Sequence, residues 1–313
     1  MIKEEHWMTD TIKIGKSDVV VSNALGLGTN KVGGHNLFGD LKDENGYALV
    51  KEALNSGISL LDTAFAYGNG RSEEIIGDVI ADYDRSKIVL ATKAAHDPSR
   101  GGKFNNRPEF LKQSVDDALK RLKTDYIDIF YIHFPDEDTP KAEAVGALSE
   151  LKDAGKIRAV GVSNFSPAQI KEANADGLVD IAEDHYNLVH REVENSEFPY
   201  LKENQISFVP YFPLASGLLT GKYDADSIGK FKQFSAAEQQ SILKALDQVR
   251  AIADGHQATV AQTILAWYLN NPAISVVIPG ARTADQVHSN VAALNVALSS
   301  SEYDQIDQLF KNF

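Results

Sequence analysis

Short apolar runs and amphipathic segments alternate along this chain. Eight runs are rich in Val, Ile and Leu with little polar alternation, a pattern typical of strands buried on both faces of a parallel sheet. They span residues 24–28, 59–64, 88–93, 126–133, 157–163, 180–186, 207–212 and 274–279. An earlier stretch, residues 12–21, has apolar ends around a polar centre that contains Gly15, and it predicts a short hairpin.

Segments with apolar residues three and four positions apart lie between these runs and predict helices. The clearest span residues 108–122, 139–154, 241–254, 259–270 and 285–294. Ser72 is followed by Glu73 and Glu74, so we expect it to cap the start of a further helix, where acidic side chains suit the helix dipole.

Eight strands joined by helical crossovers predict an α/β fold, a closed (β/α)8 TIM barrel, with an open doubly wound sheet as the alternative. No composition break or low-complexity linker divides the chain. We therefore expect a single barrel domain over residues 1–313, a length at which such barrels are common.

The charge balance and the cysteine count exclude several classes of function. The 44 acidic residues outnumber the 31 basic ones, and a net charge of −13 disfavours nucleic acid and anionic membranes as partners. The chain has no cysteine, and its histidines show no ligand spacing, so we predict no metal site. No stretch approaches the ~18–20 apolar residues of a membrane span. Met1–Trp7 lacks the apolar run of a secretory signal, so we expect a soluble cytoplasmic protein.

Four chemically distinctive side chains follow the ends of neighbouring strands. Asp62 ends one apolar run, and Tyr67 lies in the loop behind it. Lys93 and His133 end the next two runs. Each has an ordinary structural explanation alone, such as a turn, a core phenol, a rim lysine or a buried histidine. Together, at the strand ends where barrel enzymes carry their chemistry, they indicate a proton-transfer site.

Their chemistry suits the reduction of a carbonyl group. A phenol with a pKa near ~10 donates a proton weakly at pH 7, and a nearby ammonium lowers that pKa. Lys93 is the candidate ammonium, and Asp62 would keep it charged and in place. His133 could orient the substrate oxygen, on which negative charge develops as hydride adds to carbon.

The signals for a cofactor are spread over several loops. Residues 26–31 do not match Gly-x-Gly-x-x-Gly, which weakens a Rossmann interpretation. The last apolar run leads through residues 279–283 into a helix, and such a turn often binds phosphate in barrels. Arg282 could pair there with a ribose 2′-phosphate, or it could be a surface arginine. Gly and Ser residues in 213–222 could bring backbone N–H groups to a pyrophosphate. An anionic cofactor would need a local basic pocket on this acidic chain.

Six short strings in this order resemble the aldo-keto reductase superfamily, over nearly the whole chain. They are Leu61-Asp62-Thr63-Ala64 with Tyr67-Gly68, Ala91-Thr92-Lys93, Tyr131-Ile132-His133, Gly161-Val162-Ser163-Asn164-Phe165, Pro213-Leu214-Ala215-Ser216-Gly217 and Ile278-Pro279-Gly280-Ala281-Arg282. The chain looks most like the bacterial inositol-operon branch, on the residues 33–37 and 133–136.

The resemblance implies a (β/α)8 barrel with an N-terminal hairpin at its floor, extra C-terminal helices and the cofactor NADP(H). Tyr67 would be the general acid, completed by Asp62, Lys93 and His133. Ser163 and Asn164 would bind the nicotinamide carboxamide. Tyr211 would stack on the ring. Further positions implied to contact the cofactor are Glu183, Pro213, Leu214, Ser216, Gly217, Leu219, Gly280, Arg282 (2′-phosphate), Gln286 and Asn290.

The chain departs from the family pattern at two places. Glu183 stands where the family usually has Gln, three residues before Tyr186-Asn187. An ionised carboxylate there would stabilise the positively charged oxidised nicotinamide, so we expect a weaker preference for NADPH over NADP⁺ than in Glu183→Gln. The stretch 223–240 is shorter and less basic than the cofactor-covering loop expected from the family.

Three functions compete at this stage. The first is an NADP(H)-dependent reductase of aldehydes or ketones, or the reverse alcohol dehydrogenase. The second is a lyase that forms a Schiff base on Lys93, against which Asp62 argues because it raises the lysine pKa. The third is a cofactor-binding regulatory protein with little turnover.

The substrate, a small carbonyl or alcohol compound, and the oligomeric state stay open at this stage. We expect the substrate pocket to come from loops 30–41, 94–104 and 134–139. His35, Phe38 and Phe104 are candidates for its lining.

Overall fold

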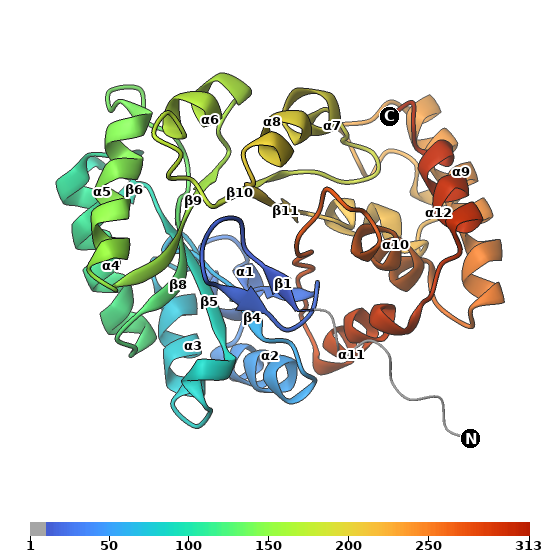
Figure 1. Cartoon of the computed structure of the whole chain (residues 1–313). Helices are drawn as coiled ribbons and strands as arrows, with labels where there is room; N and C mark the ends of the chain where they lie inside the picture. The colour runs from blue at the N-terminus through green and yellow to red at the C-terminus, as the bar shows by residue number, and fades with distance from the viewer. Residues whose placement is uncertain (1–10) are drawn as a thin grey trace.

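Seven parallel strands form one sheet in the computed structural model, which describes residues 11–313 (Figure 1). The order across the sheet is β11-β10-β9-β8-β5-β4-β3. The strands are β3 (Gly26–Gly28), β4 (Leu60–Asp62), β5 (Val89–Ala94), β8 (Ile127–Ile132), β9 (Ile157–Ser163), β10 (Ile181–His185) and β11 (Ser207–Tyr211). The sequence expectation for Met1–Trp7 concerns residues outside the described part.

The eighth predicted strand, residues 274–279, closes the barrel through single bridges rather than a continuous ladder. The Ser275 N–H donates to the Phe208 carbonyl of β11 at 2.9 Å, and the Gly26 N–H of β3 donates to the Val277 carbonyl at 2.9 Å. Parallel bridges also join Leu25 to Val277 and Gly28 to residue 280. Pro279 has no N–H to donate, which limits this ladder. The prediction of a closed barrel is confirmed, and the open doubly wound sheet is wrong.

Helices surround the sheet and cover the outer faces of the strands (Figure 1). They are α1 (Asn30–Gly33), α2 (Asp43–Asn55), α3 (Arg71–Ile80), α4 (Pro108–Leu122), α5 (Lys141–Asp153), α6 (Pro167–Ala173), α7 (Val193–Ser196), α8 (Phe198–Glu203), α9 (Ala236–Gly255), α10 (Val260–Leu269), α11 (Ala284–Ala292) and α12 (Ser300–Leu309). The expected cap at Ser72 is wrong, because α3 begins at Arg71 behind a left-handed Gly70. The Ser72 hydroxyl donates instead to the Thr29 carbonyl at 3.1 Å.

The predicted N-terminal hairpin closes one end of the barrel. It consists of β1 (Ile12–Lys13) and β2 (Val20–Val21), paired antiparallel. Gly15 sits at φ +50°, and a Cβ there would lie 2.0 Å from the Asp180 carbonyl oxygen, so the close approach requires glycine. Its N–H donates to the Ser207 hydroxyl at the start of β11. The hairpin therefore covers the N-terminal ends of the strands.

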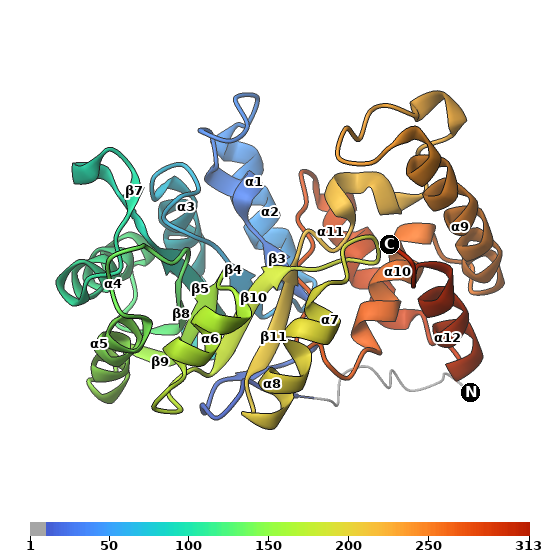
Figure 2. The same ribbon diagram turned by 90° about the horizontal axis from the view of Figure 1, so that it is seen from above.

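Two apolar layers fill the molecule. The inner layer joins hairpin residues such as Ile14 and Val19 to inward-facing strand residues such as Leu60 and Ile129. The outer layer packs the other faces of the strands against the helices. Figure 2 shows the hairpin at one end of the barrel and the segments around α1 and β7 (Lys103–Phe104, paired with β6, His96–Asp97) at the opposite end.

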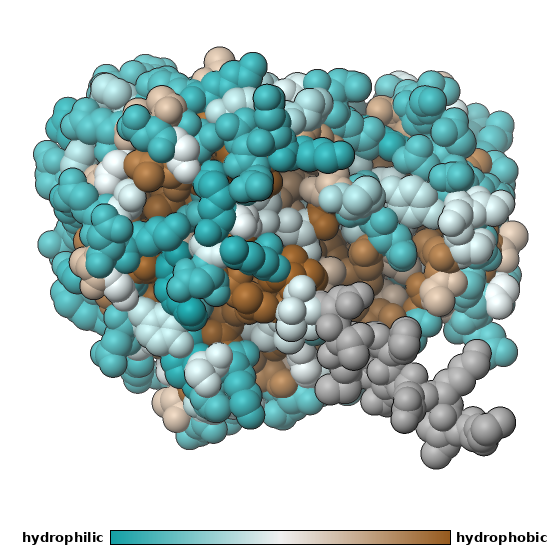
Figure 3. Space-filling view, in the orientation of Figure 1, coloured by the Kyte–Doolittle hydropathy of each residue, from teal (hydrophilic) through white to brown (hydrophobic). Residues whose placement is uncertain are grey.

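The space-filling view of the hairpin side shows a mostly hydrophilic rim around a more apolar centre (Figure 3). Within residues 11–313, no helix is both long enough and apolar enough to cross a membrane.

Candidate active site

The four residues singled out at the strand ends meet at the end of the barrel opposite the hairpin. Asp62 is the last residue of β4, Lys93 lies near the end of β5, and His133 directly follows β8. Because β4, β5 and β8 are neighbouring parallel strands, their carboxyl ends lie side by side. Tyr67 reaches the same place from the loop after β4, with its ring centroid 6.3 Å from that of His133.

Lys93 is the centre of this group and is completely buried. Its Nζ donates to Asp62 Oδ1 at 2.5 Å and to the Thr63 carbonyl at 3.0 Å. The same nitrogen lies 5.7 Å from the centroid of the Tyr67 ring. A buried ammonium needs such partners, so Asp62 holds both its charge and its position.

Glu183 supplies a second carboxylate that the sequence assigned only to the cofactor. Its Oε1 lies 3.3 Å from Lys93 Nζ, and its side chain is 3% exposed. Its Oε2 is buried and has no hydrogen-bond partner among the described residues. Nothing in the local sequence pairs Glu183 with Lys93. The contact forms because β10 turns this residue into the barrel.

One ammonium therefore faces two buried carboxyl groups. Burial lowers the pKa of Lys93, but Asp62, Glu183 and Tyr67 together raise it well above its ordinary value. Burial and the neighbouring Asp62 raise the pKa of Glu183 well above its usual range. Asp62 makes the shorter contact with the ammonium, so the geometry makes Glu183 the carboxyl group that holds a proton.

Tyr67 is half-buried, and its phenol is held neutral. Burial raises its pKa, Lys93 lowers it, and the two carboxyl groups raise it further, with a net increase. Lys93 lowers this pKa, as expected, but burial and the two carboxyl groups outweigh its effect. A neutral phenol beside an ammonium can still donate a proton to a developing oxyanion.

His133 is buried among aromatic rings. Phe134 stacks on it at 4.7 Å between centroids, and the His96 ring lies 5.6 Å away. Burial, Lys93 and His96 hold the pKa of His133 well below its usual value, so it is a neutral imidazole. Its Nδ1 has no partner within residues 11–313, so a ring nitrogen is available for a hydrogen bond.

One of the three expected lining residues lies near this group. Phe104 stacks on Phe134 at 4.7 Å and contacts the His96 ring edge-on at 5.0 Å, which extends the aromatic wall beside His133. His35 instead pairs with Asp43 at 2.7 Å. Phe38 lies beneath the cationic groups of Arg282 and Lys31.

Ser163, Asn164 and Tyr211 form a hydrogen-bonded chain next to Glu183. The Asn164 Nδ2 donates to Ser163 Oγ and to the His133 carbonyl, both at 3.0 Å. The Tyr211 hydroxyl donates to Asn164 Oδ1 at 2.7 Å. His185 stacks on the Tyr211 ring at 5.4 Å between centroids. The residues implied to hold a nicotinamide are therefore together, on β9, β10 and β11.

The loop after β11 has an irregular backbone. Three non-glycine residues have positive φ angles, at Phe212, Ala215 and Ser216, and Gly217 follows at +97°. Pro213 accepts a hydrogen bond from the Tyr268 hydroxyl, which fixes the loop to α10. Pro213 and Leu219 are buried, Leu214 is half-buried, and Ser216 is exposed. Successive residues in such conformations turn N–H groups to one side. Within the stretch 223–240, helix α9 begins at Ala236, and the Ser235 side chain caps it.

Three cations gather near this loop, and the sequence singled out only one of them. Arg282 and Lys222 both lower the pKa of Lys31, after the larger effect of burial. The guanidinium of Arg282 lies 5.4 Å from the Phe38 ring, and the ammonium of Lys31 lies 5.8 Å from the same ring. Lys31 lies on α1 and Lys222 lies in the loop after β11, far apart in the sequence, so no local pattern could have grouped them.

Arg282 is not free in this structure. Its Nη1 pairs with Asp40 Oδ2 at 2.7 Å. Its backbone N–H donates to Gln286 Oε1 at 2.7 Å, at the start of α11. Asn290 is buried on the same helix, and Gly280 bridges to Gly28 of β3. The residues expected at the phosphate and adenine end thus lie together around the first turns of α11.

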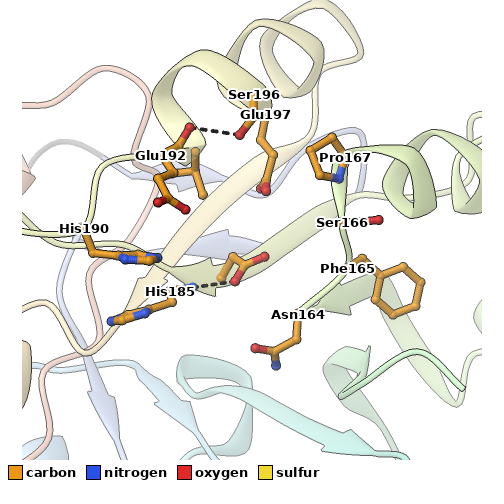
Figure 4. A pocket seen from close by; sticks show the side chains of 11 residues that line it. Asn164, Phe165, Ser166, Pro167, His185, His190, Glu192, Ser196 and Glu197 are labelled. Carbon is orange, nitrogen blue, oxygen red and sulfur yellow. Dashed lines mark hydrogen bonds between the residues drawn. The ribbon is translucent and has the colours of Figure 1, made fainter. Parts of the chain in front are cut away.

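A pocket of about 430 Å³ lies beside β10 and shares Asn164 and His185 with the group described above (Figure 4). His185 and His190 stack at one side, 4.0 Å between centroids, and the Glu197 carboxyl group points into the pocket from the opposite side. Asp184 also lines it. Burial, with Asp184, raises the pKa of Glu197 to about 8. Within the described residues, no group of three or more acidic, His or Cys side chains could hold a metal ion.

Comparison with known proteins gives one consistent result. The model of the aldo/keto reductase family matches residues 24–311. The chain is 35% identical over 306 residues to the aldo-keto reductase YhdN of Bacillus subtilis, which covers 94% of this chain and 91% of the relative. It is 34% identical over 311 residues to the NADH-specific methylglyoxal reductase of Escherichia coli, covering 93% and 95%. Among solved structures, the glycerol dehydrogenase AKR11B4 from Gluconobacter oxydans matches with a TM-score of 0.86 at 31% identity, covering 97% and 95%.

Proposed function

The chain belongs to the aldo/keto reductase family of oxidoreductases, and from this premise we propose that it reduces aldehyde or ketone carbonyls to alcohols, or runs the reverse, with NADP(H). The whole described barrel acts as one catalytic domain in this proposal. The observation that carries it is the completely buried Lys93, paired with Asp62 and placed beside Tyr67 and His133.

Tyr67 is the general acid in this proposal. Its neutral phenol, half-buried at the strand ends, donates the proton to the carbonyl oxygen as negative charge develops there. Lys93 stabilises the phenolate that remains, and Asp62 keeps Lys93 in place. The neutral His133 offers a ring nitrogen to the substrate oxygen and orients it. The aromatic rings of His96, Phe104 and Phe134 form an apolar wall on that side.

The residues beside this group fit a nicotinamide dinucleotide. Glu183 has an unpartnered buried oxygen that can accept from a carboxamide NH₂, and Tyr211 offers a half-exposed ring face. Arg282 with Lys31 and Lys222 supplies the local basic pocket that an anionic cofactor needs on a chain of net charge −13. A nicotinamide bound there supplies the hydride that adds to the carbonyl carbon.

Arg282 is the residue on which we base the preference for NADP(H) over NAD(H). A guanidinium suits a ribose 2′-phosphate, and the neighbouring lysines add positive charge. Asp40 now occupies one side of Arg282. One relative is named as NADH-specific, so the preference needs a direct test.

The test is a fluorescence titration of the protein with NADPH and with NADH. We expect tighter binding of NADPH, and we expect Arg282→Ala to weaken NADPH binding while it leaves NADH binding nearly unchanged. Asp285→Asn, a change of charge in the first turn of α11, serves as the matched control. Equal affinity for both cofactors in the wild type would contradict the NADP(H) assignment, and no binding of either would contradict the reductase proposal.

The Schiff-base alternative is disfavoured by the same geometry. A lysine must lose its proton before it attacks a carbonyl, and the two neighbouring carboxyl groups raise the pKa of Lys93. The nitrogen is also completely buried and hydrogen-bonded to Asp62 and Thr63. Failure of borohydride to trap a carbonyl substrate on Lys93 is the expected result.

A further inference from the structure

Glu183 is the part of the site that the proposed chemistry does not use. It is buried, its Oε1 lies 3.3 Å from Lys93 Nζ, and its Oε2 has no partner in the described part of the chain. Asp62 already neutralises the same ammonium at 2.5 Å. If both carboxyl groups were ionised, this buried group would carry a net negative charge with nothing to offset it.

We propose that Glu183 holds a proton when the nicotinamide is reduced and releases it when the nicotinamide is oxidised and positively charged. This inference rests on the proposed function, because it requires a nicotinamide beside Ser163, Asn164 and Tyr211. A neutral Glu183 suits a neutral reduced ring, and an ionised Glu183 offsets the charge of the oxidised ring, so the buried site stays neutral in both states.

Glu183 is surrounded by groups that all favour its neutral form except one. Lys93 on β5 favours the ionised form, while Asp62 on β4 and burial favour the neutral form. The other titratable groups that face it are Tyr67 in the loop after β4, Tyr131 on β8 and Tyr211 on β11. These three phenols are neutral, so only a new positive charge would favour the release of the proton.

The release also balances the proton consumed by the reaction. During reduction, a hydride adds to the carbonyl carbon, and the Tyr67 proton passes to the carbonyl oxygen. Tyr67 is left as a phenolate and takes up one proton. The one proton that Glu183 gives up equals that demand, so the products are the alcohol, the oxidised cofactor, neutral Tyr67 and ionised Glu183.

The experiment measures proton release during cofactor binding by titration calorimetry at pH 7, in two buffers of different ionisation enthalpy. NADP⁺ and NADPH carry the same phosphates, so protons linked to the phosphate end cancel in the difference between them. We expect NADP⁺ to release up to one proton more than NADPH. Raising the pH by one unit should tighten NADP⁺ binding by up to about tenfold and leave NADPH binding unchanged, as long as Glu183 stays protonated in the free protein.

Three variants locate the source of the proton. Glu183→Gln should abolish the difference in proton release between NADP⁺ binding and NADPH binding. Asp184→Asn, the next residue of β10 but on its outer side, should keep it. Tyr67→Phe should also keep it, because the proton comes from Glu183 and not from the phenol. A difference that survives in Glu183→Gln, or disappears in Tyr67→Phe, overturns the proposal.

The wild-type protein gives a second readout that does not depend on the folding of any variant. The infrared spectrum with NADPH should contain the carbonyl band of one more neutral carboxylic acid than the spectrum with NADP⁺, in addition to the unchanged contribution of buried groups such as Glu197. Equal proton release with the two cofactors and an unchanged infrared band would refute the proposed role of Glu183 but not the proposed function. The absence of any binding heat with either cofactor would instead refute the proposed function.

Discussion

Two consecutive residues of β10 place carboxyl groups in opposite environments. Glu183 points into the barrel, where Lys93 is 3.3 Å away. Asp184 instead lines the pocket of Figure 4 together with Glu197, and no lysine or arginine is among the described residues that line it. The inner pair of carboxyl groups shares a buried ammonium, whereas the outer pair lies beside His185 and His190 with no lysine or arginine in the lining of the pocket.

The difference shows what a buried lysine changes. Inside the barrel, one ammonium, that of Lys93, holds two carboxyl groups. In our proposal, Glu183 can still lose its proton when a further positive charge is placed beside it. In the outer pocket, repulsion by Asp184 adds to burial and raises the pKa of Glu197 to about 8. The inner group can therefore take part in proton transfer. The outer pair instead makes the stability of the fold decrease as the pH rises.

Removal of the Lys93 ammonium should have the largest effect on stability and on activity. We expect Lys93→Met to leave two buried carboxyl groups unpaired and to lower the free energy of unfolding by about 3–5 kcal/mol. Carbonyl reduction should be lost as well. Urea denaturation at pH 7 measures the first effect, and a turnover assay measures the second.

A second substitution tests the reason for that loss. Lys93→Met combined with Asp62→Asn should recover a large part of the stability without any activity, because it removes a charge rather than restoring the lysine. A double variant as unstable as Lys93→Met would show that lost packing, and not an uncompensated charge, is responsible.

Loss of the phenol should separate activity from stability within the inner group. Tyr67→Phe removes one hydroxyl and leaves the ion pair of Lys93 with Asp62 intact. We expect the rate of carbonyl reduction to fall by roughly 10²–10⁴-fold while NADPH affinity changes little. Single-turnover kinetics with a bound cofactor provide the measurement. Full turnover in this variant would contradict the role of Tyr67.

The outer pocket should respond to pH. Folding raises the pKa of Glu197 from its ordinary 4.5 to about 8, so the folded protein holds this proton more tightly than the unfolded chain. Its contribution to stability is complete below about pH 4.5, and it is lost as the pH rises to about 8. Glu197→Gln should therefore become more stable than the wild type by roughly 2–4 kcal/mol between pH 5 and pH 8.

Urea denaturation of both proteins across this range measures that difference. Ser196→Ala serves as the control, since it changes the same pocket without a titrating group. A constant difference between Glu197→Gln and the wild type at all pH values would show that Glu197 does not titrate there.

The smallest effect is expected where solvent screens the charges. Asp40 is exposed and pairs with Arg282, the residue that we propose binds the 2′-phosphate. Asp40→Asn should free Arg282 and tighten NADPH binding by roughly two- to fivefold, with little change for NADH. Fluorescence titration of both cofactors is the measurement. An equal gain for NADH would mean that Asp40 acts on something other than the 2′-phosphate.

Sequence patterns predicted the barrel and much of the candidate site because both follow from local rules. The apolar runs predicted where the strands lie along the chain. Asp62, Lys93 and His133 lie at or next to the carboxyl ends of three strands that are neighbours in the sheet. The resemblance to the aldo-keto reductases is confirmed at the level of the family and the fold. The start of α3 was missed because the left-handed Gly70, rather than a side-chain cap, sets it.

What the sequence determined by itself is the periodic pattern, since the alternation of buried runs and amphipathic segments allows few folds and fixes which residues end the strands. Only the tertiary structure decided how charges far apart in the chain combine. It brought Glu183 to Lys93, gathered Lys31 and Lys222 near Arg282, and left Glu197 beside Asp184 without a cation. The physical reason is that pKa values and ion pairs depend on distance and burial, which exist only once the strands and loops are in place.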